Sequence, residues 1–175
     1  FYPVSLFFRK ILLPLILIYV FALPLVLRFF PLKKIYFGYK FSISEIVYIW
    51  VSGAVTMLLV VNVLLKNMWG RARPNNVSYF NGFQDFTPWY KISDACSSNC
   101  SFVSGDSSVG FLLIVFYFIT KKNAYFYLGL ILGSLLGFIR IAAGGHFFSD
   151  IIFSQIVVTV TILVSFVLYK KFYDK

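Results

Sequence analysis

The stretch that decides the fold is IIFSQIVVTVTILVSFVLY at residues 151–169, which contains no charged side chain. An α-helix rises about 1.5 Å per residue, so about 20 apolar residues are needed to cross about 30 Å of hydrocarbon. Residues 151–169 are therefore predicted to form a membrane-spanning helix. The whole chain agrees, since 60% of its residues are hydrophobic, 13% are charged and the mean hydropathy is +0.85. This composition excludes disorder and argues against a water-soluble globule.

Four further segments of similar character lie toward the N-terminus, at residues 11–27, 46–65, 101–120 and 124–139. The last two are weaker, because each begins or ends in small and polar residues. We expect an all-α fold: a polytopic transmembrane helical bundle of five hydrophobic segments. It would form a single domain over residues 1–175, with an extracytoplasmic loop at 66–100. A sixth, N-terminal segment stays open as an alternative, because the chain begins at Phe1 without a Met.

The basic residues give the chain a formal net charge of +10. In a soluble protein this would suggest nucleic-acid binding, but here the charges lie between apolar runs, so no nucleic-acid partner is expected. Lys and Arg in short loops accumulate on the cytoplasmic side of a membrane. One end of the bundle would carry Arg28, Lys33, Lys34, Lys40, Lys121, Lys122, Lys170, Lys171 and Lys175. The other end would carry Arg9, Lys10, Lys66, Arg71, Arg73, Lys91 and Arg140.

The two ends differ little in their number of basic residues, nine against seven. The ratio becomes nine to three if four of the seven are assigned to an anion site and left out of the topology count: Lys66, Arg71, Arg73 and Arg140. The loop at 66–100 would then face away from the cytoplasm, and so would the polar ends of the segments beside it.

Two cysteines, Cys96 and Cys100, lie in the same loop. An oxidising, extracytoplasmic face would allow a disulfide between them, and two free thiols are the alternative. With one His in the whole chain, the pair is poor support for a zinc site.

Three short motifs carry the polar chemistry, and the first is KNMWGRARP at residues 66–74. Its cations Lys66, Arg71 and Arg73 follow directly on a hydrophobic segment. Such a cluster is commonly just the charged end of a membrane span, and a phosphate-binding site is the alternative.

The second motif is CSFVSGDSS at residues 100–108, which leads into the segment 101–120. A small-residue turn that opens a helix presents backbone N–H groups at the positive end of the helix dipole, which suits an anion. Asp106, Ser107 and Ser108 are also ordinary capping residues, so a simple helix N-cap is the alternative.

The third motif is RIAAGGHFFSD at residues 140–150. His146 and Asp150 are four residues apart, so on a helix they share a face and the carboxylate can orient the imidazole. The glycines before His146 break the preceding helix and allow Arg140 to return toward it. A lone His near a helix end is more often structural than catalytic, but this one has an acid within reach and cations arriving from other segments.

Together the three motifs resemble the phosphatidic acid phosphatase type 2 superfamily, whose pattern is K-x6-R-P, then P-S-G-H, then S-R-x5-H-x3-D. Lys66 and Arg73-Pro74 match the first block, Ser104-Gly105 match the core of the second, and Arg140, His146 and Asp150 match the third with the same spacing. The matched region runs from residue 66 to residue 150, about half of the chain.

The resemblance implies a mechanism. His146 would attack phosphorus and form a phosphohistidine that water hydrolyses, while Asp150 would fix the imidazole tautomer and stabilise the imidazolium. The non-bridging oxygens would be held by cations and by the start of a helix: Lys66, Arg73, Arg140, Ser104 and the Gly105 N–H, with Arg71 as an additional phosphate contact. No metal or other cofactor is expected, because fixed cations supply the positive charge.

The departures from the pattern concern mostly the second block. Asp106 stands where the family has the His that protonates the leaving oxygen, Val103 stands in place of Pro, and Ile139 in place of the Ser before Arg140. Asp106 could be the general acid only if burial kept it protonated, which nearby cations oppose. The alternative is that Asp106 orients basic side chains and that water protonates the leaving group.

The second and third blocks are similar to those of bacterial lipid A phosphatases, especially the 4′-phosphatases. That resemblance implies removal of a phosphate from lipid A on the periplasmic face of the inner membrane, which would weaken binding of cationic antimicrobial peptides. The alternative enzymes would use the same chemistry on a different lipid substrate: undecaprenyl diphosphate, phosphatidylglycerol phosphate, phosphatidic acid, or lipid A at its 1-position. A non-catalytic lipid-binding or flippase-like membrane protein is the alternative from another class. The aromatic loop at 75–99 would be either part of a headgroup pocket or an interfacial belt.

Overall fold

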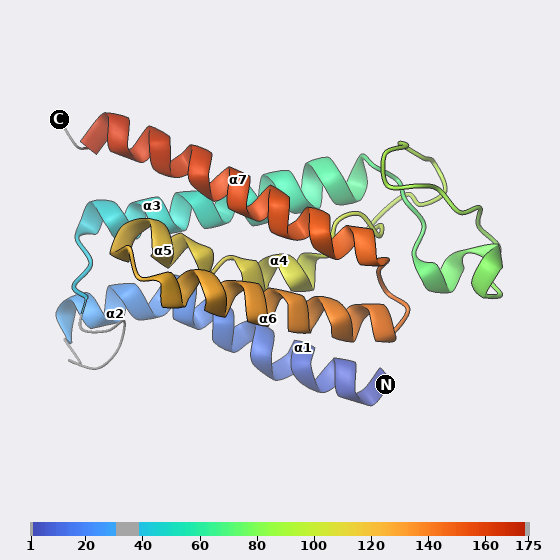
Figure 1. Ribbon diagram of the computed structural model, residues 1–175, viewed down its shortest axis with the longest axis horizontal. Coiled ribbons are helices and arrows are strands. Elements are labelled where there is room, and N and C mark those ends of the chain that lie inside the picture. The colour runs from blue at the N-terminus through green and yellow to red at the C-terminus, as the bar shows by residue number, and fades with distance from the viewer. Residues whose placement is uncertain (1, 31–38, 174–175) are drawn as a thin grey trace.

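The computed structural model describes residues 2–30 and 39–173, and within them the chain forms helices and loops with one isolated β-bridge. The elements in chain order are α1 (Tyr2–Leu17), the π-helix η1 (Ile18–Ala22), α2 (Leu23–Phe29), α3 (Ile43–Ala54), the π-helix η3 (Val55–Asn67), the 3₁₀ turns η4 (Pro74–Asn76) and η5 (Ser78–Phe80), α4 (Gly105–Phe111), α5 (Ile114–Thr120), α6 (Asn123–Ala142) and α7 (Phe148–Tyr173). Figure 1 shows the long helices running along one common axis. The all-α expectation is confirmed.

Among the described residues, four helices are long and apolar enough to cross a membrane: Leu6–Phe29, Ile43–Asn67, Asn123–Ala142 and Phe148–Tyr173. The first is built from α1, η1 and α2, and its π-helical turn lies between Pro14 and Pro24, where the regular hydrogen-bond ladder is interrupted. The second is α3 continued by η3, and it starts at a capping box in which Ser42 and Glu45 bond each other's backbone N–H.

The fifth expected segment, 101–120, differs from the prediction. Only Gly105–Thr120 is helical, which is shorter than the other four spans. Residues 101–104 stay outside the helix, and Ser104 caps its start. Figure 1 shows α4 and α5 enclosed among the longer helices. The small residues that lower the hydropathy of this segment allow α4 to pack closely against α6. A Cβ on Gly110 would lie 2.5 Å from the Cα of Gly133 in α6, so only glycine fits there.

The long loop between η3 and α4 folds back on its own start. Three backbone bonds join its two ends: Ser93 N–H to Trp69 O, Cys96 N–H to Gly70 O and Ser101 N–H to Arg71 O, at 3.0, 3.0 and 2.8 Å. Gly70 has a φ of +66°, and a Cβ there would lie 1.6 Å from Ser93 O, so this return requires glycine. A disulfide joins Cys96 to Cys100 within the same loop.

This loop and five helix ends meet at one end of the bundle, on the right in Figure 1. The ends are the start of α1, the end of η3, the start of α4, the end of α6 and the start of α7. Lys121, Lys122, Lys170 and Lys171 lie at the opposite end, as the two-sided division of basic residues predicts. Lys33, Lys34 and Lys175 belong to that prediction and lie outside the described residues.

Candidate active site

His146 lies in the turn between α6 and α7 and is 2% exposed. Its Nδ1 is 2.7 Å from the carbonyl oxygen of Ser101 and 3.5 Å from Oδ2 of Asp150. A carbonyl oxygen can only accept a hydrogen bond, so Nδ1 carries the proton in the neutral ring. This leaves the lone pair on Nε2, the nitrogen that a nucleophilic attack needs.

Asp150 lies in the first turn of α7 and its side chain is fully buried. Its Oδ2 accepts from the Ser101 hydroxyl at 2.5 Å and from the Phe147 N–H at 2.9 Å. Its Oδ1 accepts from Nη1 of Arg71, also at 2.5 Å. Both oxygens therefore have partners, and the carboxylate is held rigidly beside His146, as the i, i+4 spacing predicts.

Arg71 forms an ion pair with Asp150 and is 2% exposed. The same Nη1 donates to the Ser149 hydroxyl at 2.8 Å, and Nε donates to Thr87 O at 3.0 Å. The guanidinium also lies 4.2 Å from the centre of the Phe147 ring. The structure thus places Arg71 against Asp150, the partner of His146, and its role as an additional phosphate contact stays a prediction.

Lys66 and Arg73 converge on one residue that sequence reasoning missed, Asn99. Its Oδ1 accepts from Lys66 Nζ at 3.3 Å and from Arg73 Nη2 at 3.0 Å, and its backbone oxygen accepts from Arg73 at 2.8 and 3.1 Å. Neither cation has a carboxylate within 4 Å in the described part of the chain. Burial and the nearby Arg140 lower the pKa of Arg73 from its ordinary value. Positive charge held this closely favours a bound anion.

Arg140 returns toward this cluster from the last turn of α6. A Cβ on Gly145 would lie 2.4 Å from Arg140 Nη2, so the glycine makes the room that the folded-back side chain occupies. Nε of Arg140 is 3.3 Å from Oδ2 of Asp106, whose side chain is 15% exposed. The same carboxylate oxygen is 3.0 Å from Nε of Arg9 on α1. Asp106 is therefore paired with two guanidiniums.

Ser104 and Gly105 open α4 beside the cations. The Ser104 hydroxyl accepts from the Ser107 N–H at 3.4 Å, which makes it an N-cap. A Cβ on Gly105 would lie 3.0 Å from Lys66 Nζ, so the ammonium rests against the start of the helix. The second motif is therefore both a helix cap and a wall of the site.

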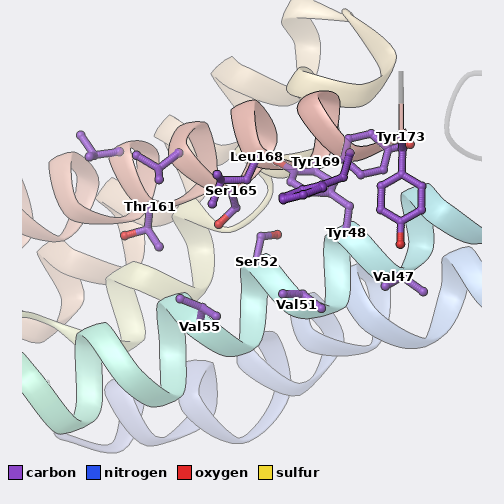
Figure 2. Close-up of a pocket in the computed structure, with 13 residues that line it drawn as sticks. Val47, Tyr48, Val51, Ser52, Val55, Thr161, Ser165, Leu168, Tyr169 and Tyr173 are labelled. Atoms are coloured by element: carbon purple, nitrogen blue, oxygen red, sulfur yellow. The ribbon is translucent and has the colours of Figure 1, made fainter. Parts of the chain in front are cut away.

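An apolar groove of about 670 Å³ lies next to His146. It runs between the end of α6, the start of α7 and the η4–η5 segment, and Phe80 and Phe148 on its walls are largely exposed. Another apolar groove, of about 510 Å³, lies between α3 and α7 near Tyr48 and Tyr169 (Figure 2). It begins at Val160, about 15 Å along the helix from Asp150, so it belongs to the other half of the bundle.

The chain is similar to known proteins of one family. The profile of the PAP2 superfamily matches residues 46–174. The chain is similar to a lipid A 4′-phosphatase of Francisella tularensis subsp. novicida (strain U112), with 43% identity over 121 residues, 67% of this chain and 53% of that protein. It is also similar to lipid A 4′-phosphatases of Rhizobium leguminosarum and Rhizobium etli, each 36% identical over 54% of this chain and over 42% and 38% of those proteins.

The chain thus spans about half, or less, of the length of the curated relatives it matches. No solved structure matches it. The family match takes in Lys66, Arg73, Arg140, His146 and Asp150, which the structure gathers at one end of the bundle. The chain therefore belongs to the PAP2 superfamily.

Proposed function

We propose that this protein is a membrane lipid phosphatase that removes the 4′-phosphate of lipid A at the periplasmic face of the bacterial inner membrane. The observation that carries the proposal is the pairing of His146 with Ser101 O and Asp150, beside Lys66 and Arg73, two cations without a carboxylate partner in the described residues. The relatives named lipid A 4′-phosphatase support the choice of lipid.

In the first step, Lys66, Arg73 and Arg140 hold the non-bridging oxygens of the phosphate monoester. Nε2 of His146 attacks phosphorus, the bond from phosphorus to the lipid oxygen breaks, and the leaving oxygen takes a proton from water. The ring becomes a phosphorylated imidazolium, whose positive charge lies next to the Asp150 carboxylate. The fixed cations favour the extra negative charge that develops in the transition state.

In the second step, water attacks the phosphohistidine, releases inorganic phosphate and returns His146 to its neutral form. The sum is one phosphate monoester and one water converted to one alcohol and one phosphate. We assign Asp106 a positioning role in both steps. Its carboxylate oxygen lies 3.0 Å from Nε of Arg9 and 3.3 Å from Nε of Arg140, which suits it to hold these two basic side chains in place.

The groove beside His146 supports a lipid in place of a small soluble phosphate ester. Its walls are mainly apolar, and they adjoin helices long enough to span a membrane. A substrate whose acyl chains stay in the membrane could lie there while its phosphate reaches the cations.

The test uses the purified protein in detergent with bis-phosphorylated lipid A. We expect mass spectrometry to find loss of one phosphate, at the 4′-position, and a His146→Ala variant to release none. Radioactive substrate should leave an acid-labile label on the wild-type protein. Parallel assays use undecaprenyl diphosphate, phosphatidylglycerol phosphate and phosphatidic acid. Phosphate release only from one of these lipids would reject lipid A, and unchanged activity of His146→Ala would reject the nucleophile.

A further inference from the structure

Arg9 is the one member of the polar cluster that lies on α1, outside the region matched by the family profile. Its Nε is 3.0 Å from Oδ2 of Asp106, and Nε of Arg140 is 3.3 Å from the same oxygen. A single carboxylate oxygen thus joins α1, α4 and α6 at the end of the bundle where His146 lies. From the sequence, Arg9 is only one of the basic residues flanking the first hydrophobic segment.

The two arginines are unequal in their surroundings. The Arg140 side chain is 11% exposed, whereas that of Arg9 is 48% exposed. The nitrogen of Arg140 in the ion pair with Asp106 is Nε, at a distance of 3.3 Å without hydrogen-bond geometry, and its two terminal nitrogens remain for other acceptors. A carboxylate with Arg140 as its sole partner would favour a bidentate pair that takes up a terminal nitrogen as well. Asp106 would then compete with the substrate phosphate for Arg140.

We propose that Arg9 is a positioning residue of the active site, which holds the Asp106 carboxylate so that Arg140 keeps its terminal nitrogens for the phosphate. Arg9 and Asp106 together carry no net charge. The positive charge of Lys66, Arg73 and Arg140 is therefore left to the substrate. This inference rests on the proposed phosphatase function, and it adds a contribution from the N-terminal helix to the binding of the phosphate.

The experiment compares Arg9→Gln with the wild type, using lipid A hydrolysis and inhibition by inorganic phosphate as readouts. Loss of Arg9 should raise both KM and the inhibition constant of phosphate by about tenfold, with a smaller change in kcat, because ground-state binding of the phosphate weakens. Arg9→Lys should recover part of the affinity. The matched control is Lys10→Gln, which removes the same charge from the next residue of α1 and should leave both constants unchanged.

The decisive comparison introduces Arg9→Gln into an Asp106→Asn variant. If Arg9 acts by restraining the carboxylate, Arg9→Gln should change KM and the phosphate inhibition constant by less than twofold there. A role of Arg9 in packing alone would give the same loss in both backgrounds and would overturn the inference. Unchanged constants in the single variant would overturn it as well.

The outcomes separate this inference from the function on which it rests. A wild-type protein that leaves lipid A intact defeats the proposed function, and phosphate binding by calorimetry then tests Arg9 by itself. A wild-type protein that hydrolyses lipid A, with an Arg9→Gln variant of equal KM, defeats only the inference. Should Arg9→Gln fail to fold, Arg9→Lys in the two Asp106 backgrounds gives the same comparison, and equal effects in both would reject it.

Discussion

At the scale of single residues, Ser101 shows how a backbone atom can decide chemistry. Its carbonyl oxygen accepts a hydrogen bond from Nδ1 of His146, and its hydroxyl donates one to Asp150. One residue therefore orients both members of the His–Asp pair. The His146–Asp150 spacing is visible in the sequence, whereas the part played by Ser101 is not. A backbone carbonyl is present at every position and leaves no mark on residue identity.

The first prediction concerns pH. Burial lowers the pKa of His146 from its ordinary value of 6.5, Arg73 and Lys66 act in the same direction, and Asp150 opposes them. In the proposed mechanism the neutral ring is the nucleophile, so we expect kcat/KM to fall on the acid side with an apparent pKa below 6.5. A pH–rate profile of the wild-type enzyme checks this, and an acid limb centred above 6.5 would contradict it.

The same shift affects stability with a defined sign. Below pH 6.5 the unfolded chain binds a proton on His146 that the folded protein does not yet bind. The free energy of unfolding should therefore decrease as the pH falls from 6.5 toward the lowered folded-state pKa, and this contribution should level off below it. Thermal unfolding of the wild type and of His146→Ala in the same detergent isolates the contribution.

The second prediction concerns Arg71. In Arg71→Gln the buried Asp150 carboxylate loses its ionic partner, which costs about 3–5 kcal/mol in comparable buried pairs. We expect a lower unfolding temperature and at least a hundredfold loss of kcat, because Asp150 no longer holds His146 in place. Arg28→Gln, a substitution at an exposed arginine on α2, is the control. If Arg71 were instead a phosphate contact, KM would rise while the unfolding temperature stayed the same.

At the scale of elements, α4 is positioned by close packing against α6. Gly110 approaches Gly133 so closely that a Cβ would lie 2.5 Å from backbone atoms, and the Ser107 hydroxyl donates to Gly133 O at 2.6 Å. This contact brings Asp106 on α4 to Arg140 on α6. The glycines and serines that dilute the apolar pattern of the segment 101–120 are therefore what allows the short helix to lie inside the bundle.

The third prediction tests this contact. Gly110→Ala should push α4 away from α6, because the added methyl group meets backbone that has no rotamer to change. We expect a loss of about 1–3 kcal/mol in stability, larger than the gain in helix propensity, together with a higher KM. Ser134→Ala, on the exposed face of α6, is the control, and equal stability of the two variants would show that the helices can part without cost.

At the scale of the whole molecule, the segments that carry most of the described basic residues lie at opposite ends of the bundle (Figure 1). Arg9, Lys66, Arg73 and Arg140 surround the candidate site, while Lys121, Lys122, Lys170 and Lys171 lie at the far end. If the second group faces the cytoplasm, the site faces the periplasm. The Cys96–Cys100 disulfide beside the site agrees with an oxidising compartment.

The fourth prediction fixes this orientation. Lys91 in the long loop and Lys122 between α5 and α6 are both exposed and lie at opposite ends of the bundle. A membrane-impermeant maleimide should label Lys91→Cys in intact spheroplasts, and it should label Lys122→Cys only after the membrane is opened. Each variant is the control for the other, and the reverse labelling pattern would place the site on the cytoplasmic side.

Local sequence determined a large part of this protein. Runs of apolar residues set the four long helices, because crossing the membrane needs only length and hydropathy. The motif spacing also indicated which residues form the candidate site, because each motif is short and its residues have fixed positions relative to one another along the chain. These residues are Lys66, Arg73, Arg140, His146 and Asp150. The short form of the third segment escaped prediction, since a buried helix need not span the membrane.

Only the tertiary structure decided which charges meet. Arg71 and Arg73 are two residues apart, yet Arg71 donates to Asp150 whereas Arg73 donates to Asn99. Arg9, near the N-terminus, contacts Asp106, which lies far from it along the chain. A salt bridge forms where two side chains of opposite charge come within about 4 Å, and that distance depends on how the helices pack and not on the separation of the residues along the chain. The sequence alone therefore indicated which residues form the candidate site, and the packing of α1, α4, α6 and α7 decided the partner of each charge.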